Sequence, residues 1–76
     1  MKTETQRTLL NGAKKELKKV KEFYPVATIQ TIEEIIKSFE NGSIRILTLN
    51  YEAKKFFKNC GFQATSLKFN NYLITY

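Results

Sequence analysis

Apolar residues recur at intervals of three and four through the first half of the chain, and this spacing predicts amphipathic helices. The first helix is expected from Glu4 to about Phe23. Pro25 should end it, because a proline pushes the residue before it out of the helical region. Its apolar stripe consists of Leu9, Ala13, Leu17, Val20 and Tyr24. We expect this stripe to face the core and the opposite side to face solvent.

A second helix is predicted between Pro25 and the pair Asn41-Gly42, which favours the left-handed conformation that stops a helix. Either Thr28 or Thr31 can cap its first turn, and Glu34 completes a capping box for Thr31. Its predicted buried residues are Ile29, Ile32, Ile36 and Phe39, with Ile35 at the border.

The residues from Ile44 to Leu49 are mostly β-branched or apolar, which predicts a strand. Asn50 is expected to cap a third helix, and Gly61 is expected to close it. The predicted buried face of this helix consists of Ala53, Phe56, Phe57 and Cys60.

A hairpin is predicted from Phe62 to Tyr76, with its turn at Asn70-Asn71, because asparagine tolerates the positive φ of a two-residue turn. This register gives three core-facing pairs: Phe69 with Tyr72, Leu67 with Ile74, and Thr65 with Tyr76. The predicted fold class is α+β in the order α-α-β-α-β-β. We expect one domain, residues 1–76, in which a small three-stranded sheet packs against the helices.

Charge suggests a use for the surface of this fold. The 76-residue chain carries a formal net charge of +6. Residues 1–24 hold seven cations against three acids and residues 50–76 hold four against one, whereas residues 25–49 hold two against three. Two basic ends therefore flank a nearly neutral middle. Nucleic-acid binders need such cations, which displace the counterions condensed on phosphates.

Aromatic residues accompany the lysines of the last third, and exposed rings can stack on bases. We expect most of the phenylalanines to be buried, namely Phe56, Phe57, Phe62 and Phe69. The better surface candidates are tyrosines, which can keep a hydroxyl in water: Tyr51, Tyr72 and Tyr76. The predicted nucleic-acid-binding residues are Lys14, Lys15, Lys18, Lys54, Lys55, Lys58, Lys68, Tyr51 and Tyr72.

Residue types suited to catalysis are scarce. Histidine is absent from the sequence, which removes the usual general base and the usual zinc ligand. Cys60 falls on the apolar stripe near a helix C-terminus, where the helix dipole opposes a thiolate, so we expect a structural cysteine. We therefore expect no enzyme activity, no metal and no cofactor.

The motif N-x-x-A-x-x-F-F-x-x-x-G-F at residues 50–62 resembles a stretch near the C-terminus of the GCN5-related N-acetyltransferases. The element order predicted for residues 28–76 is similar to the C-terminal part of that family. The chain has no counterpart of the family's Q/R-x-x-G-x-G/A loop, which grips coenzyme A. Phe57 stands where the family often has an acidic tyrosine, so the resemblance implies a shortened, degenerate acetyltransferase-like half.

Three functions follow from these observations. The first is a small basic accessory or regulatory protein that binds DNA or RNA mainly through phosphates. A lysine-bearing helix before a hairpin is similar to the reading helix and wing of winged-helix proteins. The second is a protein-interaction module or inhibitor, as a phage or mobile element could encode, docking on an acidic or apolar surface of a partner protein. The third is a degenerate acetyltransferase-like domain.

The expected location is the cytoplasm. No apolar run approaches the roughly 20 residues of a membrane span, so we expect no membrane contact. The single cysteine, Cys60, cannot form an internal disulfide, which fits a reducing compartment. A second copy of the chain, forming a homodimer, is a further candidate partner.

Overall fold

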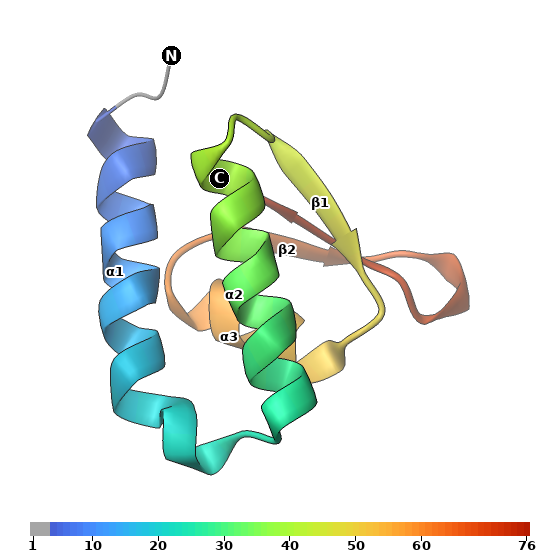
Figure 1. Cartoon of the computed structure of the whole chain (residues 1–76). Helices are drawn as coiled ribbons and strands as arrows, with labels where there is room; N and C mark the ends of the chain where they lie inside the picture. The colour runs from blue at the N-terminus through green and yellow to red at the C-terminus, as the bar shows by residue number, and fades with distance from the viewer. Residues whose placement is uncertain (1–3) are drawn as a thin grey trace.

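Two long helices, α1 (Glu4–Val20) and α2 (Val26–Glu40), lie side by side and run in opposite directions (Figure 1). The computed structural model describes residues 4–76. A short 3-10 turn at Lys21–Phe23 follows α1, so the predicted end near Phe23 is close to the observed one. The apolar stripe of α1 faces α2, although Leu10 rather than Leu9 is fully buried there.

The first turn of α2 differs from the prediction. The helix begins at Val26, with Pro25 in the N-cap position, and neither Thr28 nor Thr31 caps it. Proline suits a helix start because its fixed φ is already helical and its missing N–H would have no partner there. The Thr31 hydroxyl instead donates to the Ala27 carbonyl at 3.0 Å. At the other end, Gly42 adopts a φ of 110°, as the predicted stop requires.

The sheet contains β1 (Arg45–Thr48), β2 (Gln63–Ser66) and β3 (Tyr72–Thr75), in the spatial order β1-β3-β2, with both pairings antiparallel. Helix α3 (Tyr51–Asn59) lies between β1 and β2 in the chain, so the predicted order α-α-β-α-β-β is confirmed. The helices cover one face of this sheet and leave the other open (Figure 1). Among residues 4–76, no helix has the length and apolar character that a membrane span requires.

The predicted register of the hairpin is wrong. Strand β2 pairs with β3 so that Ala64 faces Ile74 and Ser66 faces Tyr72, and Lys68–Asn70 form a turn between the strands. Both Leu67 and Phe69, which the predicted register buries, are exposed. The cause is the burial of Phe62. Successive side chains along a strand point to opposite faces, so the burial of one side chain determines which of the following ones face the core. Burying Phe62 places Leu67 on the opposite, outward face of this segment, and Phe69 lies beyond the strand in the turn.

An aromatic cluster forms the centre of the core, where the helices meet the sheet. Phe39 of α2 lies 5.5 Å from Phe62 and 4.8 Å from Tyr76 between ring centroids. Phe57 of α3 packs edge-on against Phe62 at 5.1 Å. Tyr76 belongs to this cluster rather than to the surface, contrary to the prediction, and its hydroxyl donates to the Phe39 carbonyl. Burial, with a smaller effect of Glu40, raises the pKa of Tyr76.

The start of α3 is fixed by a hydrogen-bond network that also reaches α2. The Asn50 side-chain oxygen accepts from the Ala53 backbone N–H at 3.0 Å, which confirms the predicted cap. The Asn50 amide nitrogen donates to the hydroxyl of buried Thr28 at 3.3 Å, and that hydroxyl donates to Glu52 at 3.4 Å. At the other end, Gly61 has a φ of 102° and closes the helix, as predicted.

Replacing Asn50 tests this network. We expect Asn50→Ala to lower the free energy of unfolding by about 2 kcal/mol, because it removes a helix cap and the partner of a buried hydroxyl. Asn50→Asp keeps the cap oxygen and should cost less, while Asn59→Ala on the exposed side of α3 is the control. Chemical denaturation measures all three. Equal stabilities of Asn50→Ala and Asn59→Ala would show that the network contributes nothing.

Candidate nucleic-acid interface

The outer side of α3 carries one aromatic and three cationic side chains. Ala53, Phe56 and Phe57 are buried, so the helix is held with its opposite side outward. That side presents Tyr51, Lys54, Lys55 and Lys58. These residues lie three, four and seven positions after Tyr51, and this spacing gathers them on one stripe of a helix. Helical spacing and the burial of the opposite side thus place these four side chains on one outward stripe.

The hairpin adds a second ring to the stripe. Tyr72, at the start of β3, lies 5.8 Å from Tyr51 between ring centroids, with the rings nearly perpendicular. The Lys54 ammonium lies 5.4 Å from the Tyr51 ring centre and 5.7 Å from that of Tyr72. Both distances fall within the range of cation–π attraction. A half-buried lysine is thus held against two tyrosine rings, which limits its rotamer freedom.

None of the cations of this region, Lys54, Lys55, Lys58 and Lys68, makes an ion pair with an acid among residues 4–76. Glu52 is the acid nearest in sequence, and its carboxylate accepts the hydrogen bond from Thr28 on α2. We call the group formed by Tyr51, Lys54, Lys55, Lys58, Lys68 and Tyr72 the α3–hairpin surface.

The lysines of α1 form a separate and partly neutralised group. Lys14 makes an ion pair with Glu40 of α2, and Lys21 lies 3.9 Å from Glu33. Lys18 lines the shallow groove between the two helices together with Glu33. Helix α1 lies on the far side of α2 from the hairpin (Figure 1). The structure therefore does not bring Lys14, Lys15 and Lys18 together with the other predicted residues.

Phe69 is the residue that sequence reasoning placed wrongly. It was expected in the core, but its side chain is 88% exposed at the tip of the hairpin. Its backbone φ is +61°, a left-handed conformation that bulky residues rarely adopt, and Asn70 follows with +59°. Asn70, a residue type common in turns, follows it, and this was the available signal for an exposed position. The hairpin therefore presents an aromatic ring to solvent beside Lys68.

Changing Phe69 tests whether its backbone is strained. A residue with a side chain in the left-handed region destabilises the folded state by about 1–2 kcal/mol. The Phe69 ring is exposed, so its burial offsets little of this cost. We expect Phe69→Gly to raise the free energy of unfolding by about 0.5–1 kcal/mol, after glycine's own entropy cost. Phe69→Ala keeps a side chain in the left-handed conformation and should not raise the free energy of unfolding. Thermal denaturation measures both variants. Destabilisation by Phe69→Gly would show that the ring packs against the protein.

Cys60 is not suited to act as a nucleophile. It is half-buried at the C-terminal end of α3, and no group of His, Cys, Asp or Glu that could hold a metal occurs within residues 4–76. Burial, with a smaller contribution from Glu16, raises the pKa of the Cys60 thiol from 9.0 to about 11. At neutral pH the thiol therefore stays protonated and reacts poorly.

Alkylation measures this shift. With the folded pKa near 11 and the ordinary value at 9.0, the thiolate fraction at about pH 8 falls on the order of a hundredfold on folding. Iodoacetamide should therefore react far more slowly with the folded protein than with the protein in urea. The folded rate should keep rising with pH up to about 11. Equal rates in the folded and unfolded states near pH 8 would contradict the shift.

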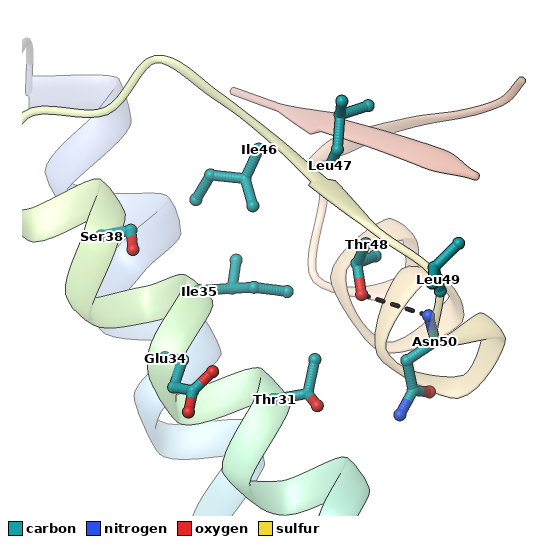
Figure 2. A pocket seen from close by; sticks show the side chains of 9 residues that line it. All are labelled: Thr31, Glu34, Ile35, Ser38, Ile46, Leu47, Thr48, Leu49 and Asn50. Atoms are coloured by element: carbon teal, nitrogen blue, oxygen red, sulfur yellow. Dashed lines mark hydrogen bonds between the residues drawn. The ribbon is translucent and has the colours of Figure 1, made fainter.

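Two hollows, of about 450 and 460 Å³, lie away from the α3–hairpin surface. One runs between α2 and β1 and is drawn in Figure 2; of the residues predicted to bind nucleic acid, none lines it. Comparison with protein-family models, curated proteins and solved structures gave no match. The resemblance to the acetyltransferases thus rests on residues 50–62 and the element order alone.

Proposed function

We propose that this chain is a small accessory or regulatory protein that binds DNA or RNA through the α3–hairpin surface. The observation that carries the proposal is the Lys54 ammonium held against the rings of Tyr51 and Tyr72, with unpaired Lys55, Lys58 and Lys68 on the same two elements. Cations without acidic partners keep their full attraction for phosphates, and ordered tyrosine rings offer faces for bases.

The arrangement of α3 and the hairpin favours a backbone-tracking mode of binding. Lys54 and Lys58 are one helical turn apart, about 6 Å along the axis, so both can contact one phosphate strand. The hairpin follows α3 directly, as the wing follows the reading helix in winged-helix proteins. Phe69 at its tip is positioned to contact a base or a sugar. Most of the affinity should come from phosphates and should fall steeply with salt.

Two triple variants with the same loss of charge test the proposal. The first replaces Lys54, Lys55 and Lys58 with glutamine, and the second does the same at Lys15, Lys18 and Lys19 of α1. Fluorescence anisotropy with labelled single-stranded DNA, duplex DNA and RNA measures the affinities at about 50 mM and about 200 mM salt. The logarithm of the binding constant falls linearly with the logarithm of the salt concentration. Removing three phosphate contacts should reduce the steepness of this line for duplex DNA by about 2.7, because each contact contributes about 0.9.

The α3 variant should lose most of its affinity, and the α1 variant should stay near the wild type. An equal loss in the two variants would show that only net charge matters. No binding of any oligonucleotide by the wild type at low salt would overturn the proposal.

A further inference from the structure

Within residues 4–76, strand β1 pairs with β3 alone, and the register shows which backbone groups of β1 point away from β3. The Leu67 N–H donates to the Asn71 carbonyl at 2.7 Å, which marks a hydrogen-bonded pair at the end of the hairpin. Hydrogen-bonded and non-hydrogen-bonded pairs alternate along an antiparallel pair of strands. The backbone N–H and C=O of Leu73 therefore bond to β2, and those of Ile74 bond to Ile46 of β1. Leu47 must then direct its N–H and C=O to the free edge.

The groove between this edge and α2 has an apolar floor and one charge. Figure 2 shows Ile35 of α2 and Ile46 of β1 pointing toward each other across it. The hollow has a volume of about 450 Å³. Its other lining residues are Thr31, Glu34, Ser38, Leu47, Thr48, Leu49 and Asn50. An extended chain along β1 would lay every second side chain into this groove.

The edge has few of the features by which proteins usually block strand pairing. Such features are very short strands, prolines, bulges and charges on the edge strand, or a covering helix or loop, and β1 is short, at four residues. Strand β1 has no proline and no bulge, and its one charge is Arg45. Apolar side chains continue along the same segment and are largely exposed: Ile44 at 69%, Leu47 at 61% and Leu49 at 70%. The edge is therefore open to another strand.

We propose that β1 binds an extended peptide segment of a partner protein, which adds to the sheet as a further strand in the groove beside α2. Main-chain hydrogen bonds to Leu47 supply affinity, and alternate side chains in the groove supply specificity. This site shares no residue with the α3–hairpin surface and does not depend on nucleic-acid binding.

Glu34 determines the chemistry of that segment. Its carboxylate is the only charge among the residues that line the groove, and it has no ion-pair or hydrogen-bond partner within residues 4–76. A cation on the peptide would complement it, and apolar residues would cover Ile35 and Ile46. The predicted segment therefore alternates apolar residues toward the groove and includes one lysine or arginine that reaches Glu34.

A second copy of the chain is a poorer occupant. Its β1 would place Ile46 and Thr48 on the helix side of the sheet and Arg45 on the other side, so the added strand itself would offer no cation to Glu34. The second α2 would arrive on the same side as the first and bring its own Glu34 toward the groove. Like charges placed together disfavour such an assembly.

A display library of random extended peptides, selected against the immobilised full chain, is the probe. The peptides that it enriches should alternate apolar residues and share a basic position. Their affinity, measured by fluorescence anisotropy, should fall about tenfold in Leu47→Pro, which lacks the edge-facing N–H but keeps the bonds between β1 and β3. Leu47→Thr keeps the N–H and serves as the matched control. Glu34→Lys should weaken binding of the basic peptides about fivefold.

Amide hydrogen exchange in the wild type gives a second readout that does not depend on a variant folding. Bound peptide should slow exchange at Leu47, while Ile46 and Thr48, which already bond to β3, should change little. Three results would overturn the proposal. These are a failure of the library to enrich any peptide, unchanged binding by folded Leu47→Pro, and a dimer in sedimentation analysis whose Leu47 amide is protected without peptide.

Discussion

The burial of Phe62 against Phe39, Phe57 and Tyr76 is the constraint on which the rest of this structure depends. It fixes which face of β2 looks inward, and it joins α2, α3 and the two ends of the hairpin in one aromatic cluster. Because Phe57 takes part from α3, the apolar side of that helix turns inward. The lysines of α3 are then held outward beside the hairpin stem, and the tip of the hairpin is left in solvent.

The same packing sorts the charge of the chain into two unlike groups. Helix α1 lies against α2, whose Glu33 and Glu40 approach its lysines, so part of its positive charge is neutralised. The lysines of α3 make no ion pair within residues 4–76: Glu52 accepts a hydrogen bond from Thr28, and Glu16 of α1 approaches the end of the helix at Cys60. The positions of the charged residues therefore tell more about the surface than the formal net charge of +6 does. The open edge of β1 adds a second surface of different chemistry, and an accessory protein that joins nucleic acid to a partner protein would use both.

Local signals in the sequence were sufficient for the element order and for several boundaries. Asn50 at the start of α3, and Gly42 and Gly61 after α2 and α3, act through their own backbone and neighbouring residues, so pattern alone identified them. The register of the hairpin was missed because it follows from the packing of Phe62 against Phe39 of α2 and Phe57 of α3. These contacts join residues of different elements, and the sequence around the turn does not show which face of β2 turns inward.

The candidate site likewise has features that the sequence was enough to predict and features that only the fold reveals. Periodicity within α3 was enough to place its lysines on one stripe. The approach of Tyr72 to Tyr51 and the ion pair between Lys14 and Glu40 join residues distant in the chain, and only the fold reveals them. Three-dimensional packing thus separates the lysines of α1 from those of α3 and the hairpin and pairs two of the former with acids.

The central claim is that unpaired cations and tyrosine rings on α3 and the hairpin contact nucleic acid. An NMR titration of the ¹⁵N-labelled protein with a short single-stranded oligonucleotide tests it most directly. The account predicts shift changes concentrated at Tyr51, Lys54, Lys55, Lys58 and Tyr72. Shifts concentrated on α1 instead, or no shifts at low ionic strength, would contradict it.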